Sequence, residues 1–229
     1  MALDKGKVGQ TKSDRSNLVA VLLLALIVGL FFLLAGEGNN KNNKNNNAPL
    51  KADVYIQAGH EGRLFGKTGS TSPYGREIDW TRIVADEATR ILRRAGVSVI
   101  RASADQRRKS VIRLALSIHF DGSKRACSTG ASIGLNNGSD RRAARVWKRM
   151  YRSVFPFKWM PDNFSRNLKY YYNYRYTLAS DAELVLELGE ISCPEQARWM
   201  KPRLKQLGAL IAYFAAQRVG ASGVKRPEF

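Results

Sequence analysis

The segment VYIQAGHEGR, residues 54–63, opens with an apolar run that leads to a glycine and a histidine. A second segment, LALSIHFDG at residues 114–122, has the same form, because its apolar run stops at His119. A third, AELVLELGE at residues 182–190, carries Glu187 inside an apolar run. Short apolar runs bounded by turn residues predict buried strands. In open α/β sheets, ligands bind at the carboxyl ends of such strands, so polar residues there are the first candidates for a site.

Helix-like segments alternate with these strands. Between Trp80 and Leu92 the apolar residues recur at three- and four-residue steps, as an amphipathic helix requires, and Gly96 ends the pattern. Further helices are expected over 139–155, with Ser139 or Asp140 as the cap, and over 204–214, and further strands over 97–100 and 130–135. The alternation predicts an α/β fold: a single layered domain with a mixed, mostly parallel sheet flanked by helices.

An uncharged apolar run precedes this domain. Residues 18–35 read LVAVLLLALIVGLFFLLA, and a helix of that length spans about 27 Å, close to the hydrocarbon thickness of a bilayer. We interpret it as an uncleaved signal anchor, a single N-terminal transmembrane helix. A cleaved signal peptide is the alternative, because Gly36 and Gly38 follow the run. The basic residues before it place the tail, residues 1–17, in the cytoplasm and export the remainder.

The exported part divides into three. Residues 36–52 are predicted to be an Asn-rich flexible linker, because the sequence EGNNKNNKNNN has no apolar side chain to bury and cannot offset the entropy of folding. Residues 53–220 should form the folded domain, and residues 221–229 a polar tail.

The candidate chemistry of the domain depends on its histidines, of which the chain has only two. Both follow apolar strands, and Glu77 lies in the first turn of a helix that begins after a Gly-rich loop. A set of two histidines and a glutamate with one open position is a ligand pattern of catalytic zinc sites. Glutamate is rarely buried without a partner, so Glu187 in its apolar strand is the candidate base beside that metal.

These motifs resemble a known family. The three opening segments, with GREIDW at 75–80 and ISCPEQARWM at 191–200, are similar to the zinc-dependent N-acetylmuramoyl-L-alanine amidases of the type 3 class, over about residues 53–218. The resemblance implies one zinc ion per domain, held by His60, Glu77 and His119. It implies that Glu187 is catalytic. The implied reaction is hydrolysis of the amide between the lactyl group of N-acetylmuramic acid and the L-alanine of the peptidoglycan stem peptide, in cell-wall remodelling or lysis.

The chain departs from the common pattern of that family at a few positions. Gln57-Ala58 stands where a small or apolar pair is common, Asp121 where asparagine is common, and Glu190 where phenylalanine is common. Glu190 is also the next candidate base after Glu187. The stretch between residues 101 and 117 is short, which predicts that a helix is trimmed or missing there.

The apolar run at residues 18–35 and the resemblance together imply a location and a substrate. The protein is expected in the bacterial inner (cytoplasmic) membrane as a single-pass protein anchored through residues 18–35, with its catalytic domain in the periplasm or at the cell exterior. Peptidoglycan is the expected substrate. A non-catalytic peptidoglycan-binding protein of the same fold is the alternative function, although Glu187 and both histidines are intact.

A formal net charge of +19 requires an explanation. Six basic residues fall on one predicted helix, at Arg141, Arg142, Arg145, Lys148, Arg149 and Arg152. They form either a solvated face or an attachment to an anionic wall polymer or lipid surface. Nucleic acid is not an expected partner, because the basic domain is exported and contains no recognisable nucleic-acid module.

Aromatic residues gather between positions 163 and 176. We consider Asn163, Tyr170 and Tyr172 candidate substrate-binding residues, since tyrosine offers an apolar face with a polar tip for a glycan or peptide. Packing in the core is the alternative for the tyrosines.

The two cysteines are Cys127 and Cys193, and each follows a strand whose end should face the zinc site. In an oxidising compartment we expect them to form a disulfide. Two separate buried thiols are one alternative. A Cys2His2 structural zinc site is another, but the ligands of such sites usually come in close pairs, and these four residues are dispersed.

Overall fold

A six-stranded sheet forms the middle of the domain in the computed structural model, which describes residues 48–64, 67–138 and 140–229. Its strands are β1 (Leu50–Lys51), β2 (Val54–Ala58), β5 (Val99–Ala102), β6 (Ser110–Asp121), β7 (Ser132–Leu135) and β8 (Thr177–Glu190). The order across the sheet is β5-β2-β6-β8-β7, and β1 also pairs with β6. Among these strands only β7 and β8 pair antiparallel. The predicted mixed, mostly parallel sheet is confirmed.

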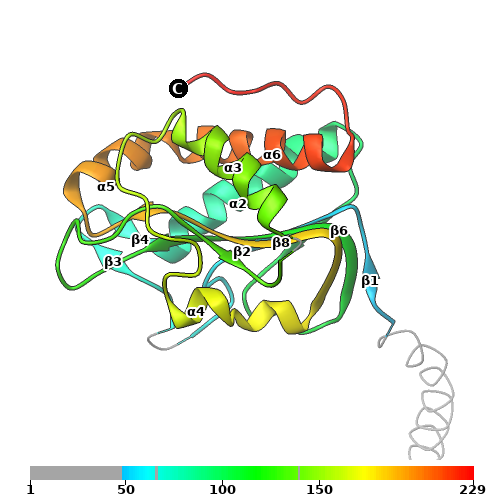
Figure 1. The fold of residues 1–229 in the computed structure, drawn as a ribbon, viewed down its shortest axis with the longest axis horizontal. Coiled ribbons are helices and arrows are strands. Elements are labelled where there is room, and N and C mark those ends of the chain that lie inside the picture. Colours follow the sequence, from blue (N-terminus) through cyan, green and yellow to red (C-terminus); the bar gives the residue numbers. More distant parts are fainter. Residues whose placement is uncertain (1–47, 65–66, 139) are drawn as a thin grey trace, which may run out of the picture. The chain divides into compact units, whose positions relative to one another are not determined.

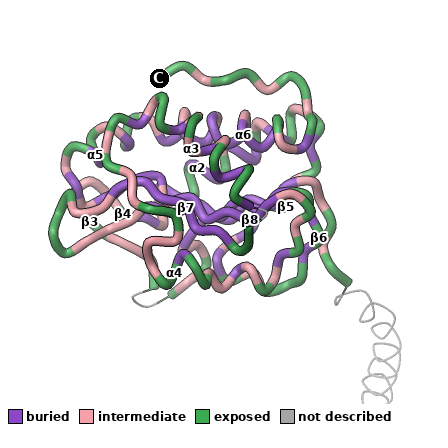
Figure 2. The backbone as a smooth tube through the Cα atoms, in the orientation of Figure 1, coloured by how far each residue is buried: buried purple, intermediate pink, exposed green. Residues whose placement is uncertain are grey.

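Helices lie on both faces of this sheet (Figure 1). The larger layer holds α2 (Glu77–Arg94), α3 (Arg141–Arg152), α5 (Pro194–Met200) and α6 (Leu204–Val219), with a 3-10 turn at Lys201–Arg203 between the last two. The short α4 (Arg166–Lys169) lies on the opposite face, followed in sequence by a 3-10 turn at Tyr172–Arg175. The strands β2, β6 and β8 are therefore largely buried on both sides in the middle of the sheet, as the purple strands of Figure 2 show. A small antiparallel pair, β3 (Thr71–Ser72) and β4 (Gly75–Arg76), precedes α2.

The packing of α2 explains its sequence pattern. Its buried face includes Trp80, Val84, Ala88 and Leu92, which lie four residues apart, so the predicted amphipathic helix is confirmed. Each large apolar side chain buried in this way contributes about 1.5 to 3 kcal/mol to folding. At the crossing with α6, a Cβ on Gly208 would lie only 2.7 Å from the carbonyl oxygen of Val84. Glycine at this position therefore lets the two helices approach closely.

Some local expectations need correction. Asp140 precedes α3, but its side chain does not cap that helix. Its carboxylate instead accepts hydrogen bonds from the backbone N–H groups of Asn137 and Glu183, which fastens the start of the helix to β8. Residues 103–109, between β5 and β6, contain no helix, as the shortness of this stretch predicted.

Both ends of the described domain are attached to it. β1 pairs with β6 from Leu50 onward, three residues before the position from which the sequence analysis expects the folded domain. The tail after α6 runs back across the helical layer (Figure 1). There the ring of Phe229 stacks on Trp199 at a centroid distance of 6.0 Å, and Arg226 donates to the hydroxyl of Ser153. The segment predicted to be a polar tail thus packs on the domain.

The apolar run at residues 18–35, the tail before it and most of the linker after it lie outside the described residues. Within the described part of the chain, no helix combines the length and the apolar character needed to cross a membrane.

Candidate active site

The candidate residues meet at the carboxyl end of the parallel strands. His60 follows β2, His119 lies near the end of β6, and Glu187 lies on β8 as the register partner of His119. Glu77 is the first residue of α2, and Thr81 of this helix donates to the carbonyl oxygen of Gly59, which holds the helix start against the end of β2. Together His60, Glu77, His119 and Glu187 line one cavity of about 750 Å³.

The two histidines and Glu77 converge on one carboxylate oxygen. Glu77 Oε1 lies 2.9 Å from His119 Nδ1 and 3.3 Å from His60 Nε2. One ligand atom from each of the three residues lies within 4.8 Å of the others. Atoms that bind a tetrahedral zinc ion at about 2.0 to 2.1 Å are themselves about 3.3 Å apart. The spacing of these three atoms therefore fits a zinc ion.

Backbone groups hold this arrangement in place. The carbonyl oxygen of Lys67 lies 2.7 Å from His60 Nδ1, so that nitrogen carries the ring proton and Nε2 presents a lone pair toward Glu77. The other oxygen of Glu77, Oε2, accepts from the N–H of Ser70 at 2.9 Å, and Oε1 accepts from the N–H of Phe120 at 3.2 Å. Fixed outer partners of this kind orient metal ligands.

The electrostatics of the cluster favour charged Glu77 and neutral His119. Burial by itself would raise the pKa of Glu77, but the neighbouring imidazoles of His119 and His60 outweigh it and lower the pKa to about 2. Burial lowers the pKa of His119. A carboxylate and neutral imidazoles are the protonation states in which such side chains bind a metal. Glu77 and His119 match this description, whereas for His60 burial lowers the pKa but the neighbouring Glu77 carboxylate outweighs it and raises the pKa.

Glu187 differs from Glu77 because no hydrogen bond among the described residues offsets the burial of its carboxyl group. Its Oε2 is buried and has no hydrogen-bond partner among the described residues. Burial raises the pKa of Glu187 well above its usual range, and the neighbouring carboxylates of Glu77 and Asp121 raise it further. A carboxyl group with a raised pKa at the wall of a cavity suits general acid–base chemistry.

Of the three candidate substrate-binding residues, two line the cavity and one does not. Tyr170 and Tyr172 line the cavity, and the guanidinium of Arg63 lies 4.4 Å from the centre of the Tyr172 ring. Asn163 does not line it. Its side-chain amide instead pairs with Leu135, accepting from the N–H at 2.7 Å and donating to the carbonyl oxygen at 3.2 Å. Asn163 therefore fastens a loop to β7 and does not line the cavity that holds the histidines; its contact with substrate stays a prediction.

Tyr171 contacts the ligand cluster, although nothing in the sequence indicated it. Its hydroxyl lies 2.8 Å from His119 Nε2 and also donates to Gln57 at 2.7 Å. Burial raises the pKa of Tyr171 well above its usual range, so the hydroxyl stays protonated. In the sequence nothing distinguishes this tyrosine from its neighbours, because contact with His119 depends on how β2, β6 and the turn at Tyr172–Arg175 come together.

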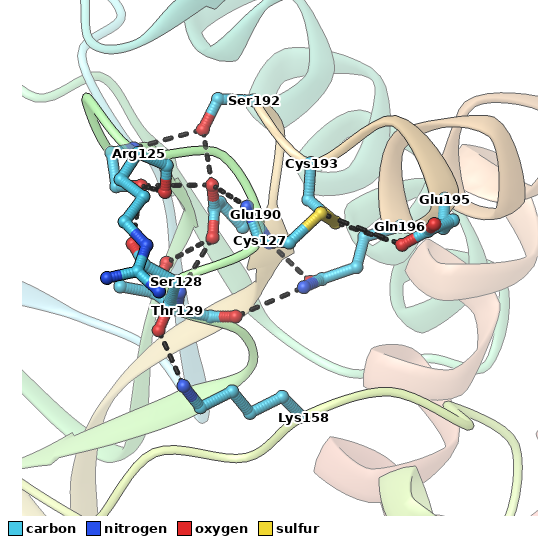
Figure 3. The surroundings of a disulfide bond; sticks show 11 residues. Arg125, Cys127, Ser128, Thr129, Lys158, Glu190, Ser192, Cys193, Glu195 and Gln196 are labelled. Atoms are coloured by element: carbon cyan, nitrogen blue, oxygen red, sulfur yellow. Dashed lines mark hydrogen bonds between the residues drawn. A yellow bond between two sulfur atoms is a disulfide. The ribbon is translucent and has the colours of Figure 1, made fainter.

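Cys127 and Cys193 form a disulfide with a Cα–Cα distance of 4.5 Å (Figure 3). Both sulfurs are thereby occupied, which excludes the Cys2His2 zinc site. Glu190 lies beside this bridge and accepts from the N–H groups of Cys127 at 2.9 Å and Thr129 at 2.7 Å. Glu190 does not line the cavity, so the structure favours Glu187 over Glu190 as the base.

Comparison with known proteins identifies the fold. No protein-family model matches the chain, and no curated protein matches it. Among solved structures, the catalytic domain of CwlV, an N-acetylmuramoyl-L-alanine amidase from Bacillus (Paenibacillus) polymyxa var. colistinus, aligns with 75% of this chain and 99% of its own, at a TM-score of 0.57 and 14% identity. The described domain therefore has the fold of N-acetylmuramoyl-L-alanine amidase catalytic domains.

Two further structures from clostridia extend this likeness. The CwlD amidase from Clostridioides difficile, solved in complex with the GerS lipoprotein, aligns with 74% of this chain and 98% of its own, at a TM-score of 0.56 and 12% identity. Cwp6 from Clostridium difficile aligns with 78% of this chain at a TM-score of 0.56 and 20% identity, but the match covers only 30% of Cwp6.

Proposed function

We propose that this protein is a zinc-dependent N-acetylmuramoyl-L-alanine amidase, which hydrolyses the amide between the lactyl group of N-acetylmuramic acid and the L-alanine of the peptidoglycan stem peptide. One observation carries the proposal. Within an amidase fold, His60, Glu77 and His119 bring three ligand atoms within 4.8 Å of one another. Glu187, whose Oε2 has no hydrogen-bond partner among the described residues, lines the same cavity.

His60, Glu77 and His119 would hold one zinc ion. Bound there, zinc would lower the pKa of a water molecule and polarise the scissile carbonyl. Glu187 accepts the proton of the attacking water and returns it to the departing amine of L-alanine, which needs a proton to leave. Its place on β8 directly opposite His119 keeps the carboxyl beside the ligand cluster throughout this transfer.

The cavity walls suit a sugar-linked peptide. Tyr170 and Tyr172 both line the cavity, and tyrosine rings can pack on sugar rings or peptide. Tyr170 is exposed, whereas the hydroxyl of Tyr172 donates to the carbonyl oxygen of Ala104. We assign these two tyrosines to substrate binding.

A non-catalytic peptidoglycan-binding protein of the same fold is the competing function. Both functions predict binding to the cell wall, so binding does not separate them. Release of stem peptides from purified peptidoglycan does, when measured with added zinc, with a chelator, and with chelator followed by excess zinc. The amidase proposal expects release, loss of release and recovery, whereas wall binding without release in all three conditions supports the alternative.

The location completes the proposal. Residues 18–35 would anchor the protein in the bacterial inner membrane, with residues 1–17 in the cytoplasm and the domain on the outer side, where peptidoglycan lies. The basic face of α3 would add contact with an anionic wall or lipid surface. Five of its arginines, Arg141, Arg142, Arg145, Arg149 and Arg152, are exposed and form no ion pair with the described residues.

Vesicles test the contribution of this face. Arginine pairs well with phosphate groups, so the protein should cosediment more strongly with anionic than with neutral vesicles. Arg145→Glu with Arg149→Glu should remove most of that difference. If these substitutions leave it unchanged, the face is merely solvated.

A further inference from the structure

We propose that Tyr171 and Gln57 form a hydrogen-bonded relay that places the ring proton of His119 on Nε2 and so leaves Nδ1 free to bind metal. The inference rests on the proposed zinc site and assigns these two side chains as positioning residues. Neither belongs to the His60, Glu77 and His119 cluster.

The relay begins at a backbone carbonyl. Gln57 is fully buried, and its Nε2 donates to the carbonyl oxygen of Ser103 at 3.4 Å and to the hydroxyl of Tyr55 at 3.4 Å. A carbonyl oxygen can only accept. Ser103 therefore fixes the orientation of the amide, with its nitrogen toward the carbonyl and its Oε1 toward Tyr171.

The direction of the next bonds follows. Gln57 Oε1 also can only accept, so Tyr171 donates its single hydroxyl proton to it, at 2.7 Å. Toward His119 Nε2, 2.8 Å away, the same hydroxyl must then accept. Nε2 therefore carries the proton. Nδ1 is left with a lone pair, which faces Glu77 Oε1 at 2.9 Å.

The lone pairs of His119 Nδ1 and Glu77 Oε1 then face each other at 2.9 Å, and they repel unless a cation lies between them. Glu77 by itself would favour the opposite tautomer, because a proton on Nδ1 could be donated to its carboxylate. A metal would have to displace that proton before binding. By holding the proton on Nε2, the relay removes this competition and orients the ring, as outer partners of metal-binding histidines do.

His60 also keeps one ring nitrogen free for the metal, but a backbone group fixes its tautomer. Its Nδ1 lies 2.7 Å from the backbone carbonyl oxygen of Lys67, so its tautomer needs no side-chain partner. Only the tautomer of His119 depends on side-chain partners. One of these, Gln57, occupies a position at which this chain departs from the common pattern of the family that it resembles.

Because the chain contains two histidines, ¹⁵N-histidine labelling gives a spectrum with signals from two imidazoles. The full-length protein, purified in detergent with a tag that contains no histidine, is compared with Tyr171→Phe and Gln57→Met. Without metal and with His119 neutral, wild type should show the Nε2–H tautomer at His119, and each variant should shift toward Nδ1–H. His119→Gln assigns the signals.

Zinc affinity, measured by competition with a chromophoric chelator, is the second measurement. Each substitution should weaken zinc binding by about 10- to 100-fold, as is typical for outer partners of metal ligands. The double variant should lose no more than Tyr171→Phe alone, since Gln57 acts only through Tyr171. Tyr174→Phe is the matched control, because its hydroxyl contacts the carbonyl oxygen of Leu168. It should keep wild-type affinity.

The outcomes separate the relay from the proposed function. Wild-type tautomer and zinc affinity in Gln57→Met, with a loss in Tyr171→Phe only, would mean that Tyr171 merely packs against the ring, and the relay would be wrong. Additive losses in the double variant would also contradict it. If wild type does not bind zinc, the proposed function fails, while the metal-free tautomers still confirm or contradict the relay.

Discussion

His119 and Glu187 are register partners on the neighbouring parallel strands β6 and β8. Directly paired residues of a sheet project to the same face, so the separation of a proposed metal ligand from the proposed base is set by backbone pairing. The register shifts just after this pair, between His119 and Asp121, and Asp121 then pairs with Glu190. This irregularity helps to place Glu190, the last residue of β8, beside the disulfide while Glu187 stays at the cavity.

Replacing Glu187 by glutamine should abolish most hydrolysis and leave zinc bound. Glutamine keeps the shape of the side chain but cannot accept and return a proton, and loss of a general acid–base costs on the order of 10²-fold or more in rate. Stem-peptide release from peptidoglycan, measured with the zinc content of the same sample, checks this.

The matched control is Glu183→Gln on the same strand. Glu183 is also buried, but it bonds Asn136 and does not line the cavity. Zinc content and hydrolysis should both stay near wild type. Near wild-type hydrolysis by Glu187→Gln would show that the base lies elsewhere.

Removing either histidine should remove the metal. His60→Ala and His119→Ala each delete one of three protein ligands, so neither variant should retain stoichiometric zinc after dialysis against a weak chelator. Metal analysis of the dialysed protein checks this, with wild type carried through the same dialysis. If both variants keep one zinc per chain, the ligand assignment is wrong.

The sequence was sufficient to predict the elements that surround the site. Apolar runs ending at His60 and His119 marked two parallel strands, and their shared sheet edge follows from the geometry of parallel strands. The pattern from Trp80 to Leu92 likewise predicted α2. These inferences succeeded because strand and helix periodicity are local properties of the chain.

Contacts between distant segments could not be predicted in the same way. Asn163 was expected at the substrate, but its amide completes the hydrogen bonds of Leu135. Tyr171 reaches His119 across 52 residues of sequence, and only the packed fold shows which of several tyrosines does so. Side-chain partners of this kind depend on the path of loops, which carries no periodic signal.

Breaking the disulfide should destabilise the domain without removing zinc. Cys127 and Cys193 are 66 residues apart, and closing a long loop stabilises a fold by about 2 to 4 kcal/mol, chiefly by restricting the unfolded chain. Cys127→Ser with Cys193→Ala should lower the midpoint of urea unfolding accordingly, and wild type treated with reductant should match it. An unchanged midpoint in both samples would contradict this contribution.

Acid should weaken the contribution of Glu190 to the stability of the fold. Burial alone would raise its pKa, but hydrogen bonds from Ser192 and Thr129 lower it below the ordinary 4.5. The charged form therefore stabilises the fold above pH 4.5, and this contribution is lost as the pH falls through the lower folded value. Glu190→Gln should be less stable than wild type at pH 7, by about 1 to 3 kcal/mol.

The stability difference between wild type and Glu190→Gln should narrow below about pH 4.5. Other acid-sensitive groups are present in both proteins and cancel in this difference. Urea unfolding at pH 7, 5 and 3 provides the measurement. A difference that stays constant over this range would show that the charge of Glu190 does not contribute to stability.

The proposed membrane anchor at residues 18–35 predicts how the protein fractionates. With its natural N-terminus, the protein should remain in the membrane fraction at full length after high-salt and carbonate washing, because an apolar helix as long as residues 18–35 is held by the bilayer core. Leu26→Arg with Val28→Arg should abolish this retention, since each arginine near the centre of a membrane helix costs about 2.5 to 3.5 kcal/mol. Attachment through the basic face of α3 alone would instead be removed by salt, which screens surface charge. A shortened soluble form that begins near Asn39 would show that the run is a cleaved signal peptide.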